Sequence, residues 1–157
     1  MVQRKVHYLT AEGQTKLRDE LDVLRMERRR EVADKLKLAA EVGGTVDNAE
    51  YDDVKREQAQ VEGRIQELEE MLQDVVLIPN KVKASGKVQV GSHVTVKNVK
   101  GASSEYVIVG SPEADPVKGR ISNTSPVGTA LIGKKSGDEV TVQTPNGPMK
   151  LKIVAIK

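Results

Sequence analysis

The segment VKREQAQVEGRIQELEEMLQDV, residues 54–75, has an apolar side chain at nearly every third or fourth position. These positions follow alternating steps of four and three, with one polar member, and are Val54, Gln58, Val61, Ile65, Leu68, Leu72 and Val75. Such a heptad pattern predicts a helix that packs one face against a partner helix. Charged residues fill most other positions, so we expect the remaining faces to contact solvent.

The preceding segment supplies the partner. Residues 11–41 contain no proline and are mostly good helix formers. An apolar stripe begins with steps of four and three, weakens at charged residues, and then resumes; its members are Leu17, Leu21, Leu24, Val32, Leu36, Ala39 and Ala40. Two long helices joined by a short loop must lie antiparallel. We therefore predict an antiparallel coiled-coil hairpin within residues 1–79, with a tip loop at residues 42–48.

Near Pro79 the periodicity changes. Short β-branched runs predict strands at residues 88–90, 94–96, 106–109, 140–142 and 151–154. Turn-forming residues separate them, and Gly133 is placed to end a short helix that contains Ala130–Ile132. The linker is expected around residues 78–86, where Pro, Asn, Ser and Gly collect. Residues 80–157 thus predict a β-rich domain, and the whole chain an α+β protein.

Charge divides along the same boundary. Residues 1–80 contain 13 Lys and Arg and 18 Asp and Glu. Residues 81–157 contain 12 Lys and Arg and 5 Asp and Glu, so the net charge of the whole chain is +2. This asymmetry indicates two domains with different roles, or one partner contacted by faces of opposite sign. Two solvated surfaces of different composition explain it equally well.

Several function classes are excluded or disfavoured by composition. The chain has no cysteine, so disulfides and thiol nucleophiles are excluded. Its two histidines, His7 and His93, stand far apart, which argues against a histidine-centred metal site or catalytic triad. No apolar run is long enough to cross a bilayer, and the first ten residues lack the apolar core of a signal peptide. We expect a soluble, cytoplasmic protein that contacts no membrane.

The triplet Arg28-Arg29-Arg30 has two interpretations. It is either a charged, solvated helix face or a contact for nucleic acid or an acidic protein groove. The chain has few aromatic residues for base stacking, which argues against sequence-specific binding of single strands.

The tip also has two interpretations. As structure alone, Gly43-Gly44 ends the first helix, and Asp47 with Glu50 forms a variant capping box that opens the second. That interpretation leaves Val42 and Val46 unexplained, because both are apolar and lie at an exposed end. The alternative is that the loop acts at another molecule's active site.

Motifs along the whole chain carry a family resemblance. They are YLTAEGQTKLRDELDVL (8–24), RREVADKL (29–36), DNAEYDDVKREQAQVEGRIQELEEML (47–72), VGSHVTV (90–96), YVIVGSPEAD (106–115) and ISNTSPVGTALIGKKSGDEVTVQTPNG (121–147). Together and in this order they resemble the Gre factors of bacterial RNA polymerase, of the GreA type. The resemblance implies an N-terminal coiled coil and a C-terminal domain of FKBP-like fold.

The resemblance also implies partners. Gre factors dock the globular domain on RNA polymerase, here through Ser125, Pro126 and Gly133, and insert the coiled coil into the secondary channel. The RNA 3′ end and DNA would be met only within the elongation complex, and such a factor associates with the nucleoid through the polymerase. The factor modulates the polymerase and is not itself an enzyme.

The tip departs from the family pattern Gly-Asp-Leu-x-Glu-Asn-Ala-Glu-Tyr, in which the first Asp and Glu help the polymerase to hold a second Mg²⁺. Aligned on Asn48-Ala49-Glu50-Tyr51, Gly44 replaces the family Asp and Asp47 replaces the Glu. The candidate tip acids are Asp47 and Glu50, with Asp47 as a ligand of a shared Mg²⁺ or Mn²⁺. The tip residues are Val42, Gly43, Gly44, Thr45, Val46, Asp47, Asn48 and Tyr51.

Four hypotheses remain at this point. The first is a weakly catalytic or non-catalytic Gre homologue that occupies the secondary channel and modulates or inhibits elongation. The second is an ordinary cleavage factor in which Asp47 and another acid suffice. A prolyl isomerase is disfavoured, because this half offers Tyr106 as its one aromatic residue. A coiled-coil scaffold without a polymerase role leaves the family motifs unexplained. The oligomeric state stays open, since the two apolar tip residues could associate.

Overall fold

The computed structural model describes residues 5–44, 46–79 and 85–157. Their contacts group them into two compact units, of which one is Gln14–Asp74 and the other contains the described residues before and after it. This grouping places residues 5–13 with the C-terminal part of the chain, whereas the sequence grouped them with the helical arm. Within the described residues no helix is both long and apolar enough to span a membrane.

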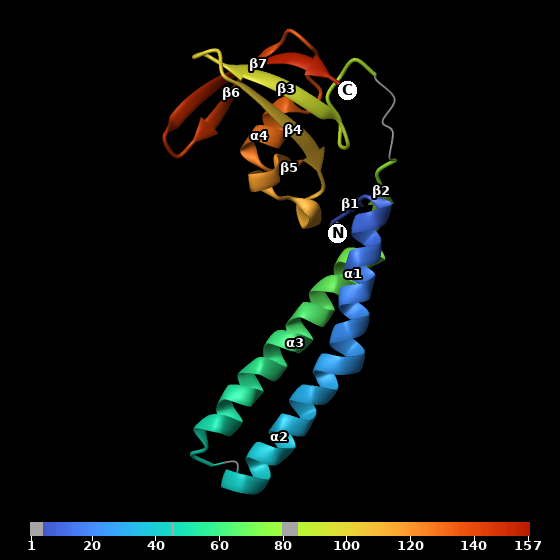
Figure 1. Ribbon diagram of the computed structural model, residues 1–157, viewed down its shortest axis with the longest axis vertical. Coiled ribbons are helices and arrows are strands. Elements are labelled where there is room, and N and C mark those ends of the chain that lie inside the picture. Colours follow the sequence, from blue (N-terminus) through green and yellow to red (C-terminus); the bar gives the residue numbers. More distant parts are fainter. Residues whose placement is uncertain (1–4, 45, 80–84) are drawn as a thin grey trace. The chain divides into compact units, whose positions relative to one another are not determined.

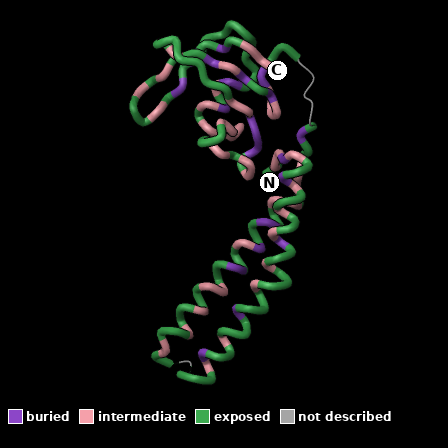
Figure 2. Tube along the Cα trace, in the orientation of Figure 1, coloured by how far each residue is buried: buried purple, intermediate pink, exposed green. Residues whose placement is uncertain are grey.

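The unit Gln14–Asp74 is a helical hairpin. Its first arm consists of α1 (Ala11–Val23) from Gln14 onward, a π-helical turn (Leu24–Arg28) and α2 (Arg29–Gly43), and α3 (Ala49–Gln73) returns beside it (Figure 1). The buried seam contains Leu21, Val32, Val61, Ile65 and Leu68, with Leu17, Leu24, Val54 and Leu72 packed against it. Figure 2 shows buried positions recurring along both arms of the hairpin. The predicted seam is therefore confirmed up to Leu72.

One end of the predicted seam is wrong. Val75 does not continue the helix, because α3 ends at Gln73 and Val75 begins the strand β2 (Val75–Leu77). Residues 75–77 are three consecutive β-branched or apolar residues, and this local composition suits a strand as well as a helix end.

The π-helical turn explains why the first stripe weakens. Leu24 and Val32 are eight residues apart, one more than a heptad step. In the turn the N–H of Arg29 donates to the carbonyl of Leu24, five residues back, so the turn accommodates one extra residue. Val32 (1% exposed) and Ala39 (2% exposed) consequently face α3. In a continuous α-helix the seam positions that follow Leu24 would instead fall on the charged residues Arg28 and Glu31.

We predict that deletion of Met26 is tolerated. Met26 lies in the π-helical turn with 75% of its surface exposed, and its removal shortens the Leu24–Val32 step to seven residues. The hairpin can then form a continuous α-helix with the same seam. Thermal unfolding followed by helical circular dichroism should retain the unmodified transition.

Deletion of Gln60 is the matched control. Gln60 is exposed within the regular helix α3, so its loss rotates every later seam residue away from the partner arm. We expect this deletion to cost several kcal/mol. Equal loss of the helical transition in both deletions would show that the π-helical turn does not set the register.

The second unit contains two sheets. In the smaller, β1 (His7–Leu9) pairs in parallel with β2, and the buried Leu9 accepts a backbone hydrogen bond from Ile78 (2.7 Å). The sequence did not predict β1. In the larger sheet the strand order is β5-β4-β3-β7-β6, antiparallel except for β4 and β5. Its strands are β3 (His93–Asn98), β4 (Ser103–Val109), β5 (Arg120–Ser122), β6 (Glu139–Thr144) and β7 (Gly147–Ile156).

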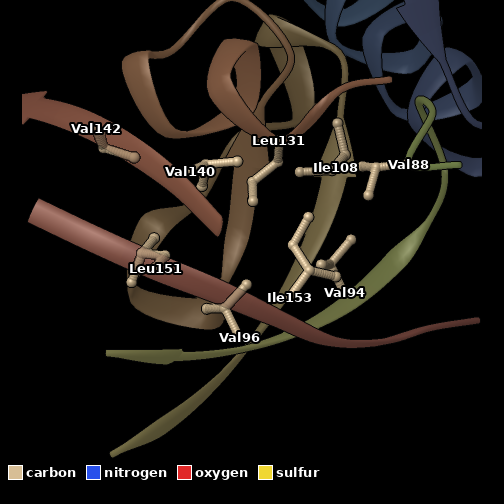
Figure 3. Close-up of a cluster of buried hydrophobic side chains, with 9 residues drawn as sticks. All are labelled: Val88, Val94, Val96, Ile108, Leu131, Val140, Val142, Leu151 and Ile153. Carbon is tan, nitrogen blue, oxygen red and sulfur yellow. The ribbon is translucent and has the colours of Figure 1, made fainter. Parts of the chain in front are cut away.

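One face of the larger sheet packs with the short helix α4 (Pro126–Leu131). The core side chains point into the space between them (Figure 3) and are Val88, Val94, Val96, Ile108, Leu131, Val140, Val142, Leu151 and Ile153. Two 3-10 turns, Ser111–Glu113 and Pro116–Lys118, connect β4 to β5. The protein is thus α+β, as predicted.

The strand predictions have a mixed outcome. Four of the predicted runs lie inside β3, β4, β6 and β7. The run at residues 88–90 forms no strand: Lys87 makes an isolated bridge to Lys135, and Val88 contributes to the core. Hydrophobicity at Val88 therefore reflected burial and not sheet pairing. The strand β5 was not predicted, since its three residues include Arg120 and Ser122.

Candidate functional site at the tip of the hairpin

The first arm ends in a backbone conformation that favours glycine. The N–H of Gly44 donates to the carbonyl of Ala40 (3.0 Å), and Gly44 has φ 73° and ψ −166°. Residues with a side chain rarely occupy this region. Asp47 also has a positive φ, of 52°, which aspartate tolerates better than most residues. Thr45 lies outside the described residues.

Asn48 begins the second arm. Its side-chain oxygen accepts a hydrogen bond from the N–H of Tyr51 (3.2 Å), so Asn48 is the N-cap of α3. Its side-chain NH₂ donates to the carbonyls of Ala39 (2.9 Å) and Gly44 (2.7 Å) at the end of α2. One amide group thus joins the end of the first arm to the start of the second.

The predicted capping box of Asp47 and Glu50 is wrong. Both residues are strong candidates on sequence alone, because an acid at the N-cap and a Glu three residues later is a capping pattern. Asn48 takes the position because its amide both accepts from α3 and donates to α2, and a carboxylate cannot donate. Gly43 permits this contact, since a Cβ there would lie 2.6 Å from the Asn48 side-chain nitrogen.

The acids of the tip are exposed. Asp47 lies on the surface, and in the described part of the chain its carboxylate has no hydrogen-bond partner. Glu50 is exposed in the first turn of α3, and Tyr51 is half-buried. Gly44 contributes no side-chain ligand. Among the described residues no cluster of three or more His, Asp or Glu could hold a metal ion.

Two apolar side chains accompany these acids. Val42 is 76% exposed and Val46 is 80% exposed. The structure therefore confirms that apolar surface is exposed at the tip. Burial of that surface against a partner would stabilise a complex.

We predict that Asn48 holds the tip together. Asn48→Ala removes both sets of hydrogen bonds and should cost about 0.5–2 kcal/mol of hairpin stability, the usual range for a lost N-cap. Asn48→Asp keeps the acceptor for Tyr51 but loses the two donated bonds, so it should be intermediate for stability. Amide hydrogen exchange of residues 39–51 measures the effect directly. Unchanged exchange in Asn48→Ala would contradict this role.

The arginine triplet contributes to the hairpin. Arg29 donates two hydrogen bonds to Glu62 on α3 (both 2.7 Å), and Arg28 pairs with Glu57 (2.9 Å). The carboxylate of Glu62 raises the pKa of Arg29, and the guanidinium lowers the pKa of Glu62. Both pairs are partly exposed to solvent, so each contributes little on its own. Arg30 is exposed, and within the described residues it has no ion-pair partner.

Two family models match this chain. The model "Transcription elongation factor, GreA/GreB, C-term" matches residues 83–157, and "Transcription elongation factor, N-terminal" matches residues 7–77. The chain belongs to the GreA/GreB family of transcription elongation factors. Members of this family are non-enzymatic modulators of RNA polymerase. Residues 78–82, near the change of periodicity at Pro79, lie between the two matches.

Two relatives of full length support this assignment, and one solved structure is also similar. Transcription elongation factor GreA of Bacillus cereus (strain ATCC 14579) is 46% identical over 158 residues, with 100% of both chains covered. GreA of Clostridium acetobutylicum (strain ATCC 824) has the same identity and coverage. The solved structure of GreA factor homolog 1 of Thermus thermophilus is 30% identical and covers 98% of this chain and 99% of its own, with a TM-score of 0.45.

The predicted docking residues of this GreA/GreB chain surround α4. Ser125 is the N-cap of this helix: its hydroxyl accepts from the N–H of Gly128 (3.0 Å) and donates to the carbonyl of Ser122 (2.7 Å). Pro126 occupies the first position of α4, where its missing N–H costs nothing. Gly133 follows the helix, and its N–H donates to the carbonyl of Val88 (2.8 Å). Each therefore has a structural role, and docking stays a prediction.

The sequence missed one cluster, formed by Thr10, Glu113 and Arg120. The side chain of Glu113 is 9% exposed. Its carboxylate accepts hydrogen bonds from the backbone N–H of Thr10 (2.6 Å), from the Thr10 hydroxyl (2.7 Å) and from the guanidinium of Arg120 (3.0 Å). The Thr10 hydroxyl also accepts from the N–H of Gly13 (3.0 Å). Thr10 before a helix is a recognisable N-cap candidate, but nothing in the sequence connects it to Glu113, 103 residues later.

Proposed function

We propose that this chain binds bacterial RNA polymerase in the cytoplasm, inserts its hairpin into the secondary channel, and modulates elongation with little or no stimulation of transcript cleavage. Family membership supports the partner and the general role. The tip carries the finer part of the proposal, because Gly44 and Asp47 stand where the family pattern has Asp and Glu. A tip that occupies the channel without supplying the usual ligands would slow nucleotide addition.

The observation that carries this proposal is the ligand content of the tip. Gly44 supplies no side-chain oxygen, while Asp47 supplies one carboxylate on a shorter side chain than glutamate. Mg²⁺ requires near-octahedral oxygen coordination and gives up its waters reluctantly. A second metal at the polymerase centre would therefore gain one carboxylate from this chain where the family pattern offers two. Mg²⁺ or Mn²⁺ at that position would be held mainly by the polymerase.

The hairpin is a long arm, which supports the proposed insertion. With 25 residues, α3 rises about 37 Å at 1.5 Å per residue. Ion pairs along its length connect the two arms, including Arg64 with Glu20 (2.7 Å) and Lys35 with Glu57 (3.1 Å). Carboxylates on both sides of Arg64 raise the pKa of its guanidinium. The exposed Val42 and Val46 provide apolar contact area at the tip for the channel wall.

A specific observation favours the alternative of an ordinary cleavage factor. Because Asn48 caps α3, the Asp47 carboxylate is not engaged in capping and is free to coordinate a metal. Relatives 44–46% identical are named transcription elongation factor GreA. Under this alternative Asp47 and Glu50, together with polymerase ligands, complete the second metal site.

A single-cysteine experiment tests where the tip goes. The chain contains no cysteine, so Val46→Cys gives a unique attachment point for an iron chelate that cuts nearby polymers. In a stalled elongation complex we expect cutting near the RNA 3′ end and around the polymerase catalytic centre. Val117→Cys, at a position 96% exposed in the other unit, is the matched control and should cut elsewhere. Cutting at the same sites from both positions, or no tip-dependent cutting near the RNA 3′ end, would contradict channel insertion.

A further inference from the structure

Four lysines gather at one end of strands β3 and β7. This lysine surface consists of Lys97, Lys100, Lys150 and Lys152, all of them exposed. Lys97, Lys150 and Lys152 alternate along their strands with the buried Val96, Leu151 and Ile153. They therefore lie on the sheet face opposite the core (Figure 1 shows β3 and β7 as neighbours).

The arrangement is unfavourable for the isolated protein. Lys97 and Lys152 are direct partners across the β3–β7 ladder, and Lys150 lies on the same face two residues before Lys152. Like charges directly opposite each other in a sheet are destabilising. In the described part of this unit, ion pairs join Lys118 to Asp115 and Arg120 to Glu113, and none involves the lysine surface. Glu139 is the partner of Lys152 across the β6–β7 ladder, but the two form no ion pair.

An apolar centre accompanies the charge. A hollow of about 270 Å³ is lined by Lys97, Val99, Glu139, Lys150, Leu151 and Lys152. Val99, in the turn between β3 and β4, is 80% exposed. A second hollow beside it is lined by Val99 and Met149 among others. The lysine surface thus combines one exposed apolar side chain, Val99, with a cationic border, as protein interfaces combine an apolar core with a polar rim.

We propose that the lysine surface binds an acidic segment of a partner protein that places one apolar side chain against Val99. Carboxylates of the segment would neutralise the opposed lysines and relieve their repulsion. A nucleic acid fits less well, because this surface has no aromatic side chain for base stacking and no arginine. The phosphate backbone also has no apolar group to occupy the hollow. This proposed binding does not depend on the hairpin or its tip.

Fluorescence anisotropy with the full chain tests the proposal. The probes are a labelled peptide with one leucine within a run of glutamates, the same peptide with serine for leucine, and a labelled DNA duplex. We expect the leucine peptide to bind most tightly and to weaken with salt. Lys97→Thr with Lys152→Thr should weaken its binding by about fivefold or more, and Val99→Ser should also weaken it. Lys134→Thr with Lys135→Thr removes the same charge from two other exposed lysines and should leave binding unchanged.

A stability measurement separates binding from a structural role. Because Lys97 opposes Lys152, Lys97→Thr should raise the Tm of the free protein while it weakens peptide binding. A lower Tm in Lys97→Thr would show that the pair is not repulsive and would overturn the premise. Tighter binding of the duplex than of the leucine peptide, or unchanged peptide binding in Val99→Ser, would overturn the proposed partner.

Discussion

A chain with both Gly44→Asp and Asp47→Glu is expected to stimulate cleavage of backtracked RNA far more than the unmodified chain. The two changes supply the carboxylates of the family pattern at the tip. Loss of one supporting group in a metal site commonly costs about 10- to 100-fold in affinity or activity. We expect a gain of about that size, measured as the rate of RNA shortening in a stalled, backtracked elongation complex with Mg²⁺.

The backbone conformation of Gly44 could reduce the gain in cleavage, because it is unfavourable for the aspartate introduced there. Its φ of 73° and ψ of −166° strain any residue that has a side chain, by about 1–3 kcal/mol. No other atom lies within 4 Å of a Cβ at this position, so the exposed loop has space to change conformation. Gly44→Asn with Asp47→Gln imposes similar strain without either charge, and is the matched control. Equal stimulation by both double variants would show that loop conformation, not metal ligation, limits cleavage.

The hairpin seam carries the second large effect. Leu68 is fully buried between the arms, so Leu68→Asp places an unpaired charge in an apolar contact. We expect a loss of about 3 kcal/mol or more in the free energy of unfolding of the hairpin. Thermal unfolding followed at the helical circular dichroism band measures this loss. Gln60→Asp, at an exposed position on the same helix, should leave the transition almost unchanged.

An unchanged helical transition in Leu68→Asp would contradict the seam assignment. Such a result would mean that position 68 contacts solvent in the folded hairpin. The five-residue buried seam could then not hold the two arms together.

The sequence predicted the features that depend on periodicity. Val61, Ile65 and Leu68 form the seam because a heptad spacing places them on one helix face, and this relation is local. The boundary of the tip was less accurate. Asp47 and Asn48 are both good N-caps, and the choice depends on the carbonyls of Ala39 and Gly44, which only the folded hairpin brings close. Exposure of Val42 and Val46 was predicted correctly because no partner stripe reaches them.

Features formed by distant contacts were not predicted. The strand β1 is only three residues long and pairs with β2, 68 residues later, so neither has a distinctive pattern. The contact between Thr10 and Glu113 likewise joins residues far apart in the sequence, 103 positions from each other. The π-helical turn is an intermediate case. The eight-residue step from Leu24 to Val32 was visible as a weakened stripe, but a weakened stripe also fits a frayed or loosely packed helix.

The most direct test of whether this chain stimulates transcript cleavage follows RNA length against time after the unmodified chain is added to a stalled, backtracked elongation complex in Mg²⁺. We expect the chain to bind the polymerase and to leave RNA cleavage little faster than it is with the polymerase alone. We also expect slower nucleotide addition by active complexes. Asp47→Ala should then change the cleavage rate little. Strong Mg²⁺-dependent cleavage by the unmodified chain, abolished by Asp47→Ala, would contradict the account and establish an ordinary cleavage factor.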